Sequence, residues 1–347
     1  MIILEKPYVS APLVAYLEEK QIPVLHNDMA AQLTAEGHHL NLLDDKQFVE
    51  QYQQKGQLYA VSENALVWLY AQLPESELVK KVKILKDKVK FREICQQIYP
   101  DFYYKEVEMK TLRSLNPDEL PLPLVLKPAV GFLSVGVYIV RNKAEWQAAL
   151  DDIDRNFAKQ CAVFPDTVVR SEKFVLEQFI EGEEYAVDAY YDAEGKPNII
   201  NIFHHIFKSE TDVSDRLYCM SKQIFESNYP AFNQFCIDLN GALGLRNFPM
   251  HVEFRVDKHT GRAIPIEVNR CVSPACASTT LRATPAICCL CNAILRTSAP
   301  TMPPCGTASR TTCSASSSWT SPTTPTVSST SSASSGTSMA CWRPATS

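Results

Sequence analysis

Residues 250–269 read MHVEFRVDKHTGRAIPIEVN, two segments of alternating apolar and polar residues joined by a five-residue loop that contains a glycine. Alternation with a period of two is typical of strands that have one buried face, so this stretch predicts a β-hairpin. If Asp257 pairs with Ala263 across the loop, the two residue numbers of every pair add to one fixed total. That total places Glu253 directly opposite Glu267.

Two glutamates that face each other across a hairpin require a counter-charge. Directly opposed Cβ atoms are about 5 Å apart, and like charges at that separation are destabilising. Asn269 falls on the same face, which completes a set of oxygen ligands suited to Mg²⁺ or Mn²⁺. The hairpin therefore predicts a metal site at Glu253, Glu267 and Asn269. A solvated strand face, with Arg255 neutralising one glutamate, is the structural alternative.

A helix with lysines near its start is predicted upstream of the hairpin. It begins at Asp87 and ends before Pro100, with Lys88 and Lys90 in its first turn. Its apolar stripe, spaced i, i+3, i+4 and i+7, consists of Phe91, Ile94, Cys95 and Ile98.

A strand, a glycine-containing loop and a second strand follow over residues 124–140. Lys127 stands at the entrance of the loop. Gly131 and Gly136 lie on either side of Ser134. Glycines let backbone N–H groups approach phosphate oxygens closely, and a lysine adds fixed positive charge. The segment is therefore either a phosphate-binding loop or an ordinary hairpin turn.

Residues 174–185 read FVLEQFIEGEEY, an apolar strand that carries the isolated Glu177 and ends in an acidic turn. The backbone of such a segment suits an adenine edge, and its carboxylates suit ribose hydroxyls. A solvated acidic loop is the alternative.

In this order, the four segments resemble the ATP-grasp superfamily over residues of about 80–270. Order and spacing both match: a helix with Lys, a strand ending in Lys with a glycine loop, a Glu-bearing hinge, and a Glu…Glu-x-Asn strand pair. The resemblance implies ATP and Mg²⁺ (or Mn²⁺) as cofactors. The phosphate loop departs from the family pattern, because Leu133 and Ser134 stand where many members have more glycine.

The resemblance also implies roles for individual residues. The implied nucleotide-binding residues are Lys88, Lys127, Gly131, Ser134, Gly136, Glu177, Gln178, Phe179, Ile180 and Glu184. Lys88 and Lys127 would contact phosphates, and Glu184 would bind ribose. The metal ligands would be Glu253, Glu267 and Asn269. The catalytic candidates, which would stabilise the transferring phosphoryl group, are Arg255 on the metal side of its strand and Lys208 in the loop after His204-His205.

The expected fold class is α/β (α+β), in three parts. Residues 1–78 begin with a β-α-β rhythm and resemble the small α/β domain that precedes an ATP-grasp domain. They lack a GxGxxG after the first strand, so a dinucleotide site is unsupported. Residues 79–270 are expected to form the ATP-grasp domain, with mixed and antiparallel sheets. Residues 271–347 form a low-complexity tail.

The tail differs sharply in composition from the rest of the chain. Residues 271–347 contain no Asp, Glu or Lys, but hold 32 Ser or Thr among 77 positions and eight of the twelve cysteines. Such a segment buries too little apolar surface to offset about 1–2 kcal/mol of backbone entropy per residue, so we expect disorder. A cysteine module or a Ser/Thr-rich stalk is the functional alternative.

A shifted reading frame also explains the tail. The segment Asn-Arg-Cys-Val-Ser-Pro at 269–274 can be encoded by AAC CGA TGC GTT TCG CCG. Restoring one C after the Asn codon gives Asn-Pro-Met-Arg-Phe-Ala, a continuation typical of ATP-grasp proteins after Glu-x-Asn. We therefore interpret the tail as out of frame.

Composition limits the function classes. A formal net charge of −5 in 347 residues argues against a general nucleic-acid binder. No stretch approaches 18 apolar residues, and Glu5 and Lys6 stand where a signal peptide would be apolar. We expect a cytoplasmic protein without a membrane span, and the sequence leaves a homodimer open.

The activity implied by the resemblance is ATP-dependent ligation. A substrate carboxylate would attack the γ-phosphate to give an acyl phosphate, and an amine or thiol would then displace phosphate. The alternative is an inactive or regulatory ATP-binding module that lacks an acceptor pocket. The sequence identifies neither substrate.

Overall fold

A computed structural model describes the fold over six stretches of the chain. The described stretches are 1–6, 8–131, 136–157, 170–207, 217–269 and 340–342. Ser134, Lys208 and most of the predicted tail lie outside them.

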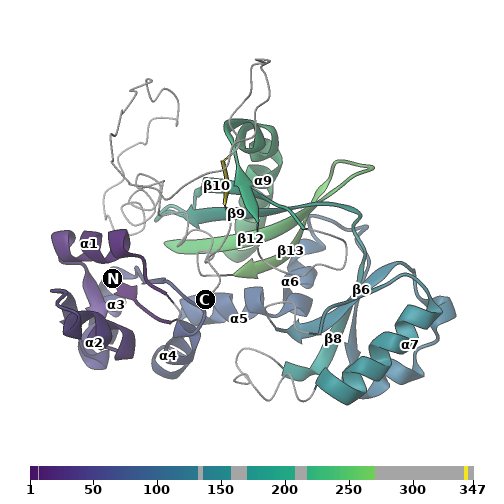
Figure 1. Cartoon of the computed structure of the whole chain (residues 1–347), viewed down its shortest axis with the longest axis horizontal. Helices are drawn as coiled ribbons and strands as arrows, with labels where there is room; N and C mark the ends of the chain where they lie inside the picture. The colour runs from purple at the N-terminus through teal and green to yellow at the C-terminus, as the bar shows by residue number, and fades with distance from the viewer. Residues whose placement is uncertain (7, 132–135, 158–169, 208–216, 270–339, 343–347) are drawn as a thin grey trace, which may run out of the picture.

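The N-terminal region is a four-stranded parallel sheet of order β3-β2-β1-β4 with helices α1 to α4 around it (Figure 1). Its strands are β1 (Ile2–Ile3), β2 (Pro23–Leu25), β3 (Asn41–Leu43) and β4 (Tyr59–Ala60). Its helices are α1 (Ala11–Lys20), α2 (Asp28–Ala35), α3 (Asp45–Lys55) and α4 (Ala65–Gln72). The predicted opening β-α-β unit is confirmed.

Two helices, α5 (Glu77–Lys86) and α6 (Lys88–Cys95), connect this region to the rest of the chain. Asp87 ends the first helix and caps the second, since its carboxylate accepts hydrogen bonds from Val89 N and Lys90 N. The predicted start of this helix at Asp87 is therefore confirmed, but the helix ends at Cys95, so Ile98 of the predicted apolar stripe lies beyond it.

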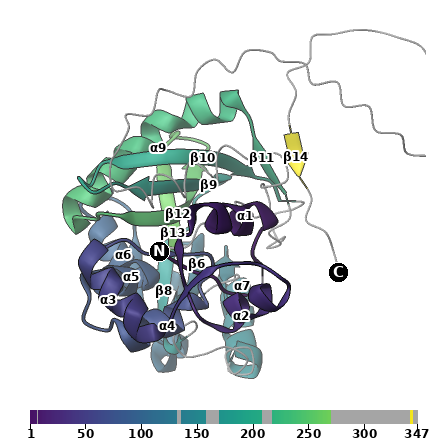
Figure 2. The same ribbon diagram turned by 90° about the vertical axis from the view of Figure 1, so that its left-hand side faces the viewer.

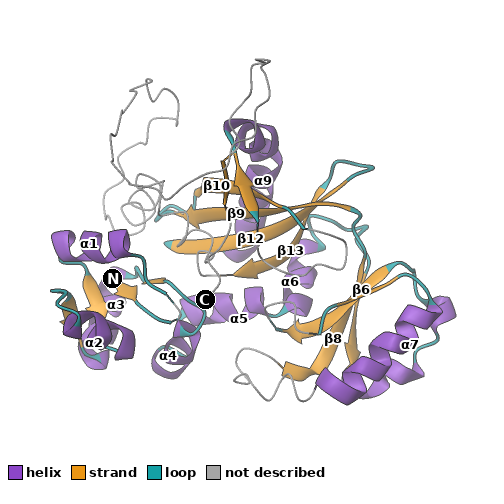
Figure 3. Ribbon diagram, in the orientation of Figure 1, coloured by secondary structure: helices purple, strands orange, loops and turns teal. Residues whose placement is uncertain are grey.

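The second sheet is antiparallel, in the order β5-β8-β6-β7, and helix α7 covers it (Figure 3). Its elements are β5 (Tyr104–Glu108), 3₁₀ turns at Met109–Ser114 and Pro117–Glu119, β6 (Leu124–Val130), β7 (Tyr138–Val140), α7 (Lys143–Asp152), a π-turn at Ile153–Phe157, and β8 (Arg170–Gln178). Lys127 lies inside β6, which runs to Val130, rather than at the entrance of a loop as predicted.

The third sheet has six strands in the order β13-β12-β9-β10-β11-β14 and is antiparallel throughout. Its strands are β9 (Gly182–Tyr191), β10 (Pro197–His205), β11 (Tyr218–Met220), β12 (Phe248–Asp257), β13 (Ala263–Asn269) and β14 (Ala340–Trp342). Of the tail expected to be disordered, only β14 lies among the described residues, and it pairs with β11 (Figure 2).

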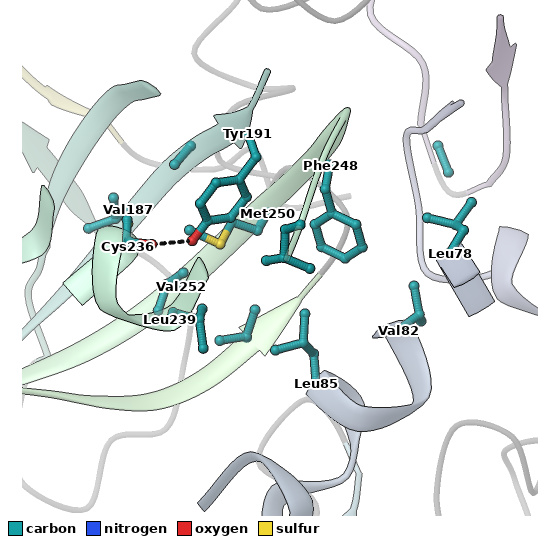
Figure 4. Close-up of a cluster of buried hydrophobic side chains, with 14 of the residues drawn as sticks. Leu78, Val82, Leu85, Val187, Tyr191, Cys236, Leu239, Phe248, Met250 and Val252 are labelled. Carbon is teal, nitrogen blue, oxygen red and sulfur yellow. Dashed lines mark hydrogen bonds between the residues drawn. The ribbon is translucent and has the colours of Figure 1, made fainter. Parts of the chain in front are cut away.

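Helix α9 (Lys222–Leu243) packs on one face of the six-stranded sheet. Alternate residues of β9 and β12 point into this core, and the Tyr191 hydroxyl donates 2.8 Å to Cys236 O on α9 (Figure 4). Side chains of α5 join the same core, so the connecting helix is fixed to the sheet. The labelled core residues are Leu78, Val82, Leu85, Val187, Tyr191, Cys236, Leu239, Phe248, Met250 and Val252.

The predicted hairpin forms, but its register differs from the prediction near the loop. Ala263 pairs with Val256 and not with Asp257, because the Asp257 carboxylate accepts hydrogen bonds from the turn, including that of Thr260 N. A bulge at Ile266 then shifts the register by one residue.

The bulge has a direct consequence for the predicted metal ligands. Without it, Glu267 would lie opposite Val252 and point into the apolar core. With it, Glu253 pairs with Glu267, as predicted, and His251 pairs with Asn269. Both glutamates and Asn269 therefore share the face of the sheet that lies away from α9.

Candidate functional site

Buried charged side chains gather where α6 meets the second sheet and the β12–β13 hairpin. We call four of them the cation cluster: Lys86, Lys88, Arg92 and Lys127. All four are less than a tenth exposed. Their carboxylate partners come from three different parts of the chain, so tertiary folding brings the charges together.

Glu177 lies at the centre of the first group. Arg92 donates to both of its oxygens, at 2.8 and 3.0 Å, and Lys127 Nζ lies 2.8 Å from Oε2. Arg92 also donates to Pro265 O at 2.6 Å, which joins α6 to β13. Burial raises the pKa of Glu177, but Arg92 and Lys127 outweigh it and bring the pKa down to about 2.

Burial in this position disfavours the charged form of Lys127. Burial lowers its pKa, Glu177 acts against that change, and the neighbouring Arg92 and Lys88 lower it further. Lys127 also donates 3.3 Å to Ile266 O, at the bulge of β13. Two cations share the Glu177 carboxylate, so this part of the site carries surplus positive charge.

Lys88 bridges the glycine loop and the predicted metal site. Its Nζ donates 3.0 Å to Gly131 O and lies 3.3 Å from Glu267 Oε1. Burial raises the pKa of Glu267, but Lys88, Lys86 and Lys127 outweigh it and lower the pKa below its usual value. Glu267 is thus an ionised carboxylate at neutral pH.

The far end of the glycine loop has a strict steric requirement. Gly136 has φ of +72°, and a Cβ there would lie 2.5 Å from the ring of Phe157. The loop therefore returns to β7 through a position that only glycine fits.

Lys86 joins the N-terminal region to the hairpin. Its Nζ donates 2.8 and 2.9 Å to the two carboxylate oxygens of Glu63, which follows β4, and 3.2 Å to Asn269 Oδ1.

Glu184 and Arg255, predicted to bind ribose and the phosphoryl group, lie on neighbouring strands and contact each other. Arg255 Nε and Nη2 lie 3.3 and 3.2 Å from Glu184 Oε2, and His205 Nδ1 lies 2.9 Å from Oε1. Arg255 Nη1 also reaches Ile180 O at 3.5 Å. Arg255 shares the face of Glu253, as predicted, but its contacts are with the predicted hinge and ribose residues.

The predicted hinge, Glu177 to Ile180, spans the end of β8, because Glu177 and Gln178 are the last two residues of that strand. The N–H groups of Gln178 and Phe179 donate to Tyr103 O and Pro123 O, at 3.0 and 3.3 Å. These two hydrogen bonds therefore attach the hinge to the segments before β5 and β6. The Glu177 side chain belongs to the charge network.

Sequence reasoning missed a second buried row on the same face of the sheet. His251 Nδ1 lies 2.8 Å from Asp188 Oδ1, Asn201 donates 3.4 Å to Asp188 Oδ2, and His251 Nε2 lies 3.9 Å from Glu253 Oε1. The isolated Asp188 in the apolar strand YAVDAYY was the available signal.

Arg92 was also missed, although it lies one helical turn after Lys88 on the same face of α6. Neither Glu63 nor Lys86 carries a signal of this kind in the sequence.

The domain bearing most of these side chains matches a known family. Residues 120–279 match the ATP-grasp domain. This part of the chain is similar to ATP-grasp domains. The resemblance identified from the sequence is confirmed, and the match extends into the stretch interpreted as out of frame.

Solved ATP-grasp structures share the fold at low identity, and no curated protein matches the sequence. L-amino acid ligase from Bacillus licheniformis has a TM-score of 0.55 at 19% identity, over 84% of this chain and 73% of that one. Biotin carboxylase from Campylobacter jejuni, solved as a β-γ-ATP complex, has 0.61 at 13%, over 86% and 72%. N5-carboxyaminoimidazole synthetase from Staphylococcus aureus, complexed with ADP, has 0.55 at 12%, over 78% and 70%.

Two features are absent from the part of the chain that the structure describes. Within the described stretches, no helix combines the length and apolarity that crossing a membrane requires. Over the same part of the chain, no group of three or more His, Cys, Asp or Glu side chains is arranged to hold a metal ion. The predicted set has only two glutamates, with Asn269 as its third member.

Proposed function

We propose that the chain is an ATP-dependent ligase that binds ATP with Mg²⁺ or Mn²⁺ between α6, the second sheet and the β12–β13 hairpin. The observation that carries this proposal is the buried network in which Lys88 and Lys127 meet Glu267 and Glu177. Keeping several charges under a tenth exposed is costly for stability alone, so a site that handles charged phosphates accounts for them better.

The side chains of Glu253, Glu267 and Asn269 fit a hard divalent cation. They offer oxygen donors on one face, Glu267 is ionised, and water and phosphate oxygens would complete the coordination. Held by these side chains, such an ion would offset the negative charge of the phosphate groups.

The chain's own residues have distinct tasks in this proposal. Lys88 and Lys127 neutralise phosphate charge, and Lys88 also holds the glycine loop at Gly131. Arg255 and Glu184 position the ribose end beside Ile180. Preorganised charge of this kind stabilises a transferring phosphoryl group without a covalent enzyme intermediate.

The proposed reaction has two steps. A substrate carboxylate oxygen bonds to the γ-phosphorus while the bond to the bridging oxygen breaks, which releases ADP and leaves an acyl phosphate. An amine or thiol then attacks the acyl carbon and phosphate leaves. Both substrates are small molecules.

An ATP-binding module without ligase activity is the second candidate. The change of composition after residue 270 favours it, because the family resemblance implies that the acceptor side of the site follows Glu-x-Asn. In this case ATP binding persists and no carboxylate stimulates ADP formation.

A product assay tests the ligase proposal. ADP formation should depend on Mg²⁺, on one of a panel of carboxylic acids, and on an added amine or thiol. Lys127→Ala should abolish it, whereas Lys105→Ala, which changes an exposed lysine on β5 of the same sheet, should not. ATP binding without stimulation by any carboxylate would favour the second candidate.

A further inference from the structure

Lys86 is a buried cation with partners in two separate parts of the chain. It is 6% exposed and ends α5, where the negative end of the helix dipole favours an ammonium group. Glu63 accepts from it with both oxygens, and Asn269 Oδ1 lies 3.2 Å away. Glu63 follows β4 of the N-terminal sheet, so one lysine joins that sheet to the end of β13.

Lys86 also acts on the second predicted metal ligand of β13. Its charge is among those that lower the pKa of Glu267, together with the charge of Lys88. Lys86 Nζ already lies 3.2 Å from Asn269 Oδ1, so a divalent cation held by Glu267 and Asn269 would be repelled by the Lys86 ammonium group. A nucleotide phosphate there would instead be attracted.

We propose that Lys86 is a positioning residue: its ammonium group lies at Asn269 Oδ1 before a metal ion binds, and Glu63 holds Lys86 in place afterwards. This inference rests on the proposed metal site. Lys86 disfavours a bare metal ion and favours the nucleotide, so ATP and metal enter together. Glu63, which follows β4 of the N-terminal sheet, weakens both effects because its carboxylate partly neutralises the Lys86 ammonium group.

Two single variants change the local charge in opposite directions. Lys86→Met removes a positive charge, so binding of Mn²⁺ alone should tighten about threefold or more, and binding of metal-free ATP should weaken by a similar factor. Glu63→Gln removes the negative charge that Lys86 pairs with, so both effects should reverse in sign. The double variant should return towards the wild type.

The measurements are calorimetric titrations of the full chain with MnCl₂ alone and with ATP in EDTA. Lys80→Met, an exposed lysine of the same helix paired with Glu77, is the matched control and should change neither. Lys86→Arg keeps the charge and should stay near the wild type. If Lys86→Met does not fold, Glu63→Gln still tests the predicted direction of both shifts.

Shifts of the same sign in both single variants, or no shift in either, would overturn the inference. A wild-type chain that binds neither Mn²⁺ nor ATP would instead refute the proposed function, so the two failures are distinguishable.

Discussion

On one side of the six-stranded sheet, alternate residues of β9 and β12 pack against α9; on the other, their neighbours carry buried charges. The α9 side contains Val252, Phe254 and Tyr191, which are all fully buried. The opposite side contains Asp188 and His251, equally buried but held by specific partners. The same strands thus gain stability from apolar area on one face and depend on charge pairing on the other.

This difference predicts how substitutions on each face behave. On the α9 face, the loss scales with the volume removed and leaves the site chemistry intact. On the charged face, removing one partner leaves another charge buried without compensation.

The largest expected effect is on the α9 face. Phe254 packs 4.4 Å from the ring centroid of Phe232 and 5.0 Å from that of Phe235. Phe254→Ala should lower the free energy of unfolding by about 3–5 kcal/mol, measured by urea denaturation. Ile237→Ala, exposed on α9, should stay within about 0.5 kcal/mol. Equal losses in the two variants would contradict the assigned core.

Breaking the Glu177 network should cost about 3 kcal/mol. Glu177→Gln leaves Arg92 and Lys127 buried with one neutral partner, although Arg92 keeps its bond to Pro265 O. The matched control is Glu181→Gln, which removes an exposed ion pair with Lys258 and should cost at most about 1 kcal/mol. An unfolding free energy unchanged in Glu177→Gln would show that the network contributes nothing.

Lowering the pH should remove the contribution of the Glu177 carboxylate to the free energy of unfolding. The pKa of Glu177 falls from 4.5 to about 2 on folding, so its contribution is complete above pH 4.5 and is lost as the pH falls towards 2. Urea unfolding measured between pH 7 and pH 3 should show a smaller slope for Glu177→Gln than for the wild type. Parallel curves would mean that Glu177 keeps an ordinary pKa in the folded chain.

The smallest expected effect is a single hydrogen bond on the α9 face. Tyr191→Phe removes the bond to Cys236 O but keeps the ring in the core, so the loss should be about 1 kcal/mol. A loss as large as that of Phe254→Ala would mean that the hydroxyl, rather than the packing, organises this core.

Local pattern was enough to predict the elements that carry the site. The alternation at 250–269 gave both strands of the hairpin, and the lysine-bearing helix began at Asp87 as expected. The Glu253–Glu267 pairing was predicted correctly only because two deviations cancel. Ala263 pairs with Val256, one residue earlier than predicted, and the bulge at Ile266 then restores the predicted register. The roles predicted for these residues remain predictions.

The charge network was beyond sequence reasoning, because its partners lie far apart in the chain. Arg92 and Glu177 are separated by 85 positions, and Lys86 and Asn269 by 183. A periodic pattern reports which face of an element is buried, but it does not report which distant charge will meet that face.

Calorimetric titration of the wild type and Lys127→Ala with ATP, at saturating Mg²⁺ and in EDTA, tests the central claim most directly. The wild type should bind MgATP, and Lys127→Ala should weaken ATP binding in both conditions. Titrated in the same way, Glu267→Gln should weaken mainly the Mg²⁺-dependent part. No heat from the wild type at millimolar MgATP, or equal affinity in Lys127→Ala, would contradict it.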